Sequence, residues 1–276
     1  MPSLKYSSKS TFFQRLICLL LDVEFVWWIA HLSTVYNGVK YYLWLLRVSS
    51  KSAWAYPLVF LSSIVTYGLI LLKAGESDAR LSQKFQRLLF TETGAYLLLS
   101  VVWTLYPPIL TAPLPYILYS LIHAVNFLRT NVLFCFFPRA EEEIDRIKRN
   151  PSTEPVLVSS LLSLVLRDFI YRVYAMVVWM ISKVEILVTT PLLLLFCVYS
   201  KKFTPLILYL YFLFQRFRNS VVAKRLISQF TSAADAFLLS DDRNPVLRSA
   251  YSSAKSLLGR RFQPQPQKAP TALKPS

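Results

Sequence analysis

FVWWIAHLSTVYNGVKYYLWLL, residues 25–46, is an apolar run of 22 residues in which Lys40 is the one Asp, Glu, Lys or Arg. A helix of this length rises about 33 Å, enough to cross a hydrocarbon core about 30 Å thick. Trp27 and Trp28 near its start and Trp44 near its end are typical of the membrane–water interface, where an aromatic ring has one wet and one dry side. The stretch predicts a first transmembrane helix, and Lys40 is close enough to the end to extend its ammonium group outward.

The same apolar pattern recurs along the chain. Five further membrane segments are predicted, at residues 56–72, 88–106, 109–128, 184–199 and 203–214. Pro107 and Pro108 separate the third segment from the fourth, because a proline ring cannot continue the helical hydrogen-bond ladder. The last two segments have 16 and 12 residues, so they rise only about 24 and 18 Å as helices. We expect them to form a hairpin that does not fully cross, within an all-α polytopic membrane protein of four to six membrane segments.

Composition supports this fold class and divides the chain. Hydrophobic residues make up 54% of the chain and charged residues only 17%, which is low for a soluble domain. We expect a cytosolic amphipathic segment at 1–24, a membrane domain at 25–214, amphipathic membrane-surface helices at 215–262 and a disordered tail at 263–276. The three cysteines form no CxxC pair, so neither a disulfide framework nor a metal site is indicated.

Positive charge predicts the orientation. The chain has 31 Lys and Arg against 15 Asp and Glu, an excess that in a soluble protein suggests nucleic acid but in a membrane protein follows the positive-inside rule. With both termini on one side, that side carries 26 Lys and Arg and the other 4, or 15 against 4 without the tail. Both termini are therefore predicted to be cytosolic, and no nucleic-acid partner is expected. Residues 129–183 are mixed in character, and Arg167, Asp168 and Arg172 place their stretch at the interface.

The sequence offers little chemistry. His31 and His123 both lie inside predicted spans, where an ionisable group is a functional candidate, but a neutral histidine bonded to a neighbouring helix fits equally well. Glu142 and Arg146 stand four residues apart in a charged stretch that predicts a solvated helix. We expect no catalytic residues, metal or cofactor.

The tail carries the candidate binding residues. Two amphipathic helices are predicted, over 217–239 and, after a break, over 246–262. The residues expected to enter the membrane are Phe217, Val222, Leu226, Phe230 and Phe237 in the first and Leu247, Tyr251, Leu257, Leu258 and Phe262 in the second. The basic contacts expected on anionic, curved membrane are Arg248, Lys255, Arg260, Arg261 and Lys268. The alternative is that these helices pack on the membrane domain.

Three stretches resemble one eukaryotic family. They are Thr-Phe-Phe-Gln-Arg-Leu at 11–16, Tyr-Ile-Leu-Tyr-Ser-Leu-Ile-His-Ala at 116–124 and Tyr-Phe-Leu-Phe-Gln-Arg-Phe-Arg-Asn at 211–219. The chain is similar to the tetraspanning family of vertebrate transmembrane protein 33 and the fungal pore-membrane nucleoporins. This resemblance implies a non-enzymatic protein of the endoplasmic reticulum and nuclear envelope that shapes tubules or sheets beside reticulon-type proteins. It also implies a role in nuclear pore distribution or assembly with nucleoporins, and a tail that binds a karyopherin through the Arg260, Arg261 and Lys268 region.

The sequence therefore favours a membrane-shaping or scaffold protein. A small-solute or ion channel or carrier remains the alternative, although no convincing internal repeat is visible and few polar residues line the spans. An enzyme acting on lipids is a third possibility.

Overall fold

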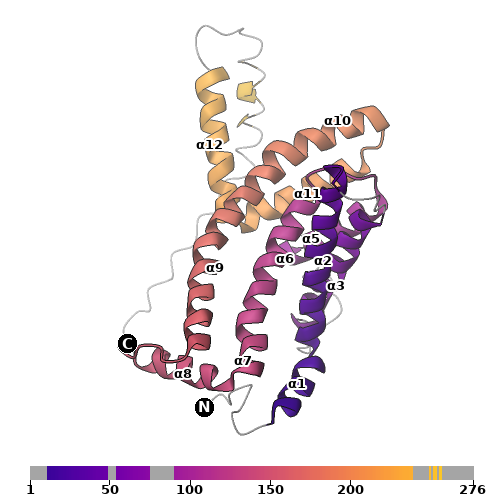
Figure 1. The fold of residues 1–276 in the computed structure, drawn as a ribbon. Coiled ribbons are helices and arrows are strands. Elements are labelled where there is room, and N and C mark those ends of the chain that lie inside the picture. The colour runs from indigo at the N-terminus through magenta and orange to yellow at the C-terminus, as the bar shows by residue number, and fades with distance from the viewer. Residues whose placement is uncertain are drawn as a thin grey trace, which may run out of the picture. The chain divides into compact units, whose positions relative to one another are not determined.

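The computed structural model describes residues 11–48, 54–74, 90–238, 249, 251–253, 255 and 256. Every regular element in these ranges is helical (Figure 1). The chain forms two compact units, residues 1–224 and 225–276, which are described separately. Three described helices are long and apolar enough to span a membrane, and a fourth span results if the bent pair α1–α2 counts as one. The predicted all-α polytopic fold class is confirmed.

The first unit is built around a bundle of antiparallel helices. These are α1 (Phe12–Leu20), α2 (Val23–Leu45), α3 (Ala55–Ala74), α5 (Glu92–Leu105) and α6 (Pro113–Phe127). Helix α2 packs against α3 and α6, and α3 packs against α5 (Figure 1). Helix α1 bends away from α2 by 68° at Leu21 and Asp22, where the Asp22 carboxylate caps α2 by accepting from the Glu24 amide at 2.9 Å. A helix in the predicted amphipathic segment is thus present, and its position on the membrane stays a prediction.

Aromatic side chains fill the centre of the bundle. Phe60, Tyr96 and Trp103 are almost fully buried, and Tyr116 lies edge-on to both Phe60 and Tyr96, with ring centroids 5.2 and 5.5 Å away. Such edge-to-face pairs add about 0.5–1.5 kcal/mol beyond the area they bury. The core therefore holds α3, α5 and α6 in a fixed arrangement.

Prolines set the ends of the middle helices. The sequence predicts the break at Pro107 and Pro108, but the predicted fourth segment starts at residue 109, four residues before the helix does. Helix α5 ends before Pro107, and α6 begins at Pro113, where the missing amide is harmless because a first-turn N–H has no intrahelical partner. Helix α6 continues through a π-turn, η1 (Leu128–Val132), into α7 (Leu133–Phe136), and α8 (Pro138–Arg149) follows.

The C-terminal half of the first unit differs most from the expected segments. Helix α9 (Val158–Lys183) continues through the π-turn η2 (Val184–Thr189) into α10 (Thr190–Ser200) without a break (Figure 1). The predicted segment 184–199 therefore does not begin a helix but ends one of 43 residues. Arg167, Asp168 and Arg172 lie in the first half of this helix, which contains a stretch long and apolar enough to span a membrane. Their position at the interface stays a prediction. Helix α11 (Thr204–Asn219) turns back beside α10, and α12 (Val221–Leu238) follows.

Candidate functional site

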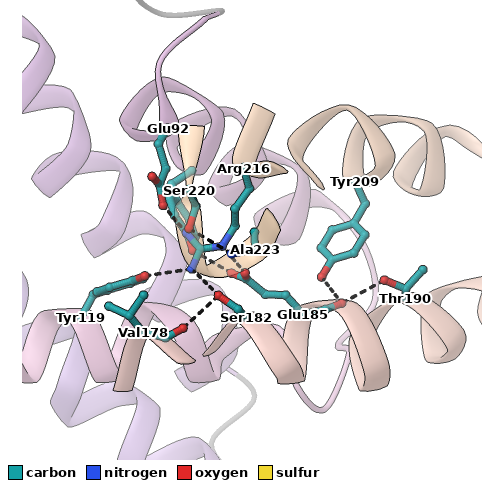
Figure 2. Close-up of polar contacts among 11 residues, drawn as sticks. Glu92, Tyr119, Val178, Ser182, Glu185, Thr190, Tyr209, Arg216, Ser220 and Ala223 are labelled. Carbon is teal, nitrogen blue, oxygen red and sulfur yellow. Dashed lines mark hydrogen bonds and ion pairs between the residues drawn. The ribbon is translucent and has the colours of Figure 1, made fainter. Parts of the chain in front are cut away.

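A buried arginine lies near the end of α11. The side chain of Arg216 is only 3% exposed, and its Nε lies 2.5 Å from Glu185 Oε2 in an ion pair (Figure 2). A second ion pair joins the guanidinium to Glu92 at the start of α5. Arg216 Nη2 donates to the Tyr119 hydroxyl at 3.0 Å and to Ser182 Oγ at 3.4 Å. We call Arg216, Glu185, Glu92, Tyr119 and Ser182 the Arg216 cluster.

Glu185 is fixed at both its carboxylate and its carbonyl. Its side chain is 3% exposed, and Tyr96 donates a hydrogen bond to Oε1 at 2.7 Å. Its backbone carbonyl accepts from the hydroxyls of Tyr209 and Thr190, both at 2.9 Å (Figure 2). The π-helical turn η2 places this residue within reach of α5, α10 and α11, which supply its partners. Single π-helical turns inside α-helices are often found at functional sites.

The Arg216 cluster anchors the α10–α11 hairpin to the bundle. A charge taken out of water is tolerated only when it is paired and hydrogen-bonded, and here the guanidinium has both carboxylate and hydroxyl partners. The guanidinium carbon also lies 5.6 Å from the centroid of the Tyr96 ring, within cation–π range. The cluster joins α5, α6, the α9–η2 junction and α11.

The sequence pattern alone does not predict this cluster. Arg216 was counted among the tail cations, and Glu185 was given no role. One signal was available: Glu185 is the sole Asp or Glu between Asp168 and Asp235, in an otherwise apolar and basic stretch. An isolated carboxylate in such a run predicts a buried cationic partner.

The two helices of the hairpin have one buried and one exposed face. Leu193, Cys197, Leu206, Tyr209 and Phe212 face the aromatic core. Other side chains of the hairpin are large, apolar and exposed, and together we call them the hairpin surface: Leu194, Leu195, Val198, Tyr199, Phe203, Ile207, Leu208, Leu210 and Phe214. An exposed apolar face of this extent is typical of contact with lipid or with another protein.

The tail helices are joined by a different contact. Lys255 Nζ lies 2.6 Å from Asp235 Oδ2, and the Tyr251 hydroxyl donates to Asp235 Oδ1 at 3.0 Å. In this structure both Tyr251 and Lys255 contact Asp235 of α12, and their contact with the membrane stays a prediction. We call Asp235, Tyr251 and Lys255 the tail clasp.

The remaining predicted tail residues fall into three groups. The predicted helix 217–239 is divided at Ser220, whose hydroxyl accepts from the Ala223 amide at 3.3 Å and caps α12. Phe217 therefore belongs to α11. Along α12, Val222 is half-buried, Leu226 is buried and Phe237 is exposed. Phe230 also lies in α12. Outside the described residues lie Leu247, Leu257, Leu258, Phe262, Arg248, Arg260, Arg261 and Lys268.

The two histidines lie together between α2 and α6. Their rings stack with centroids 5.0 Å apart, and His31 Nδ1 lies 2.9 Å from Ser120 Oγ. Trp27 packs edge-on against His31. This arrangement favours histidines that join neighbouring helices. Among the described residues, no group of three His, Cys, Asp or Glu side chains is placed to hold a metal ion.

The charged helix α8 also differs from its predicted pairing. Arg146 pairs with Glu143 at 3.6 Å rather than with Glu142. Glu143 is buried and accepts hydrogen bonds from Ser160 Oγ at 2.7 Å and from the amides of Val156 and Leu157, so it caps α9 from a neighbouring helix. Burial raises the pKa of Glu143, but the hydrogen bonds outweigh it and lower the pKa below the usual value.

Comparison with known proteins gives a family match. The model of the family described as Transmembrane protein 33/Nucleoporin POM33 matches residues 7–264. Nucleoporin POM33 of Chaetomium thermophilum is 22% identical over 250 residues, covering 88% of this chain and 87% of that protein. Tetra-spanning protein 1 of Schizosaccharomyces pombe is 20% identical over 252 residues, covering 90% of this chain and 87% of that protein. No solved structure matches the chain significantly.

Proposed function

Because the chain belongs to the Transmembrane protein 33/Nucleoporin POM33 family, we propose that it is a non-enzymatic membrane-shaping or scaffold protein of the endoplasmic reticulum and nuclear envelope. The family predicted from three short stretches is thus the family that matches. In this proposal the protein organises tubules and sheets and contributes to nuclear pore distribution or assembly, with both termini in the cytosol.

The hairpin surface is the observation that carries the proposal. Helix α11 has 16 residues and rises about 24 Å, less than the roughly 30 Å of a hydrocarbon core. Helix α10, the last part of the continuous 158–200 helix, packs beside α11 and adds 11 residues, about 16 Å, beyond η2. Their outward face is apolar, and the Arg216 cluster holds α11 on the bundle. A short apolar hairpin held rigidly in one leaflet expands that leaflet and favours curvature.

The tail would add lipid and protein contacts. Its predicted apolar face enters the headgroup region, and its cations attract anionic lipid on curved membrane. Reticulon-type proteins, nucleoporins and a karyopherin are the protein partners that this role would bring to the tail and the bundle.

Reconstitution tests the hairpin. The full-length protein is incorporated into liposomes, and electron cryomicroscopy measures vesicle diameter as the protein-to-lipid ratio rises. We expect narrower vesicles or tubules with the native chain, and much less change with Leu195→Asn and Ile207→Asn, which are 68% and 64% exposed and make the hairpin surface polar. Leu195→Val and Ile207→Val are the matched control because they keep the surface apolar. Vesicles that keep their size but release an entrapped solute would instead support the channel or carrier.

A second experiment tests the tail. A peptide of residues 215–276 is mixed with liposomes of decreasing diameter, and circular dichroism follows its helicity. Helix gain that grows with curvature supports a curvature-sensing tail, and Leu257→Asp with Leu258→Asp should release the peptide. A peptide that stays unbound would contradict lipid contact and leave the tail as a docking segment for proteins.

A further inference from the structure

A cavity lined by residues outside the Arg216 cluster opens on the bundle. Its volume is about 490 Å³, within the range of small-molecule sites, and it lies where the start of α2 faces the end of α3 and the junction of α6 with η1. Trp27, Leu69, Ile70 and Phe127 contribute apolar wall. Neither the proposed membrane shaping nor the tail uses this cavity.

Among the described residues that line the cavity, one acid and one base stand at its rim. Glu24 lies in the first turn of α2 and Lys73 in the last turn of α3, and their side chains form an ion pair with Nζ 2.6 Å from Oε1. The two side chains are 39% and 63% exposed, so they remain accessible. Asn126 and Thr130 add an amide and a hydroxyl on the opposite wall. Glu24 and Lys73 thus stand at helix ends, and Trp27 and Leu69 lie one turn deeper.

This layout matches the interface of a membrane. Lys73 is the last residue of the candidate span Ala55–Lys73, which places the rim at headgroup level and the apolar wall in the acyl region. A ligand that fits must carry apolar chain beside a positive and a negative group. An anionic lipid satisfies Lys73 but meets the Glu24 carboxylate, whereas a zwitterion satisfies both.

We propose that this cavity binds one zwitterionic glycerophospholipid, with its phosphate on Lys73, its ammonium group on Glu24 and the start of an acyl chain against Trp27 and Ile70. Binding exchanges the ion pair between Glu24 and Lys73 for two pairs with the lipid. Opening that pair costs little, because both side chains are partly exposed and an exposed pair is weak.

Native mass spectrometry of the full-length protein tests the site. The protein is purified in detergent and titrated with phosphatidylethanolamine or phosphatidylglycerol of identical acyl chains. We expect one tightly held phosphatidylethanolamine per chain. Ile70→Trp fills the cavity and should raise the Kd for phosphatidylethanolamine about tenfold or more. Leu72→Trp is the matched control, since Leu72 lies on the same helix but is 71% exposed and does not line the cavity.

Charge variants test the headgroup assignment without altering the core. Glu24→Gln removes the negative member of the ion pair and keeps Lys73 charged. The protein should then bind phosphatidylglycerol more tightly than phosphatidylethanolamine. Lys73→Gln should weaken both lipids. Circular dichroism shows that each variant remains folded. Equal binding by Ile70→Trp and Leu72→Trp, a native preference for phosphatidylglycerol, or an unchanged lipid preference in Glu24→Gln would each overturn the proposal.

Discussion

The Arg216 cluster and the tail clasp use the same chemistry in opposite surroundings. The ion pair between Arg216 and Glu185 spans 2.5 Å, and that between Lys255 and Asp235 spans 2.6 Å. Both side chains of the first pair are 3% exposed, whereas those of the second are 48% and 30% exposed. Nearly equal distances therefore describe two contacts of very different consequence.

The difference lies in what remains when one partner is removed. Loss of Arg216 would leave a carboxylate in a site that water does not reach, and such a charge is expensive. Loss of Lys255 would leave Asp235 partly hydrated, because water and salt already screen that pair. The first contact suits a permanent joint, and the second suits a segment that exchanges an internal partner for a phosphate.

The largest expected effect comes from Arg216→Leu. Removing the guanidinium leaves Glu185 buried and unpaired, so the free energy of unfolding should fall by about 3–5 kcal/mol. Thermal unfolding in detergent micelles, followed by circular dichroism, measures the loss. Arg218→Leu, an exposed cation on the same helix, is the control. Arg216→Leu combined with Glu185→Leu should recover part of the stability. Equal losses for Arg216→Leu and Arg218→Leu would erase the contrast between the two sites.

Substitutions at two glycines, Gly38 and Gly68, test how tightly the apolar faces of the bundle helices pack. A Cβ at Gly38 would lie 2.3 Å from Ile117 Cδ1 and Cγ1, so Gly38→Ala forces α2 from α6 or displaces the isoleucine. We expect a loss of about 1–3 kcal/mol, the usual cost of overpacking. A Cβ at Gly68 meets nothing within 4 Å, so Gly68→Ala should be neutral or slightly stabilising. The same unfolding assay compares them, and a Gly38→Ala chain as stable as Gly68→Ala would contradict close packing of α2 on α6.

Glu143 should have an effect on stability between those of the Arg216 cluster and the tail clasp. It is a buried carboxylate on the charged helix α8, outside the candidate spans. Glu143→Gln weakens the cap of α9 and should cost about 1 kcal/mol, in the range of lost helix caps. The pKa of Glu143 is lowered, so its contribution is complete above the ordinary value of 4.5 and is lost as the pH falls through the folded-state pKa. The unfolding midpoint of the native chain should therefore fall on acidification more steeply than that of Glu143→Gln. Exposed Glu142→Gln should keep the native pH profile, and identical profiles for all three would rule out the cap.

The smallest expected effect comes from Asp235→Asn. Hydrogen bonds from Lys255 and Tyr251 lower the pKa of Asp235, so the carboxylate is charged at neutral pH and the variant removes the ion pair of the tail clasp. The thermal midpoint of the bundle should not change. Limited trypsin digestion after Lys255 should become moderately faster, and added salt should narrow the difference from the native chain. Ser232→Ala on α12 is the control. A midpoint shift as large as that of Arg216→Leu would show that the clasp is not an exchangeable contact.

Local signals in the sequence predicted the parts of the fold that depend on local physics. The apolar run 25–46 nearly coincides with α2, and the prolines at 107 and 108 mark the end of α5. The sequence does not predict the continuous helix from 158 to 200, because Arg167, Asp168 and Arg172 place their stretch at the interface and Lys183 looks like a polar boundary. Glu92 and Arg216 are 124 residues apart, so spacing alone cannot pair them.

In the tail, too, sequence periodicity alone does not predict the structure. The period of 3.6 residues continues through Ser220, so periodicity alone predicts one helix where the structure has two. Serine is a favoured helix cap, and that signal was present in the sequence. The residues that line the cavity come from α2, α3, α6 and η1, and no sequence motif predicts that they lie together.

The Arg216 cluster also has an order in time. The chain leaves the ribosome from its N-terminus, so Glu92, Tyr119, Ser182 and Glu185 have all been synthesised before Arg216. Glu92 is synthesised before most of the helices and Glu185 before α10 and α11, and the arginine that neutralises both arrives with the last helix of the hairpin. A chain that stops before residue 216 would hold both acids and lack this cation, so the joint between hairpin and bundle is the last part of the first unit that can form.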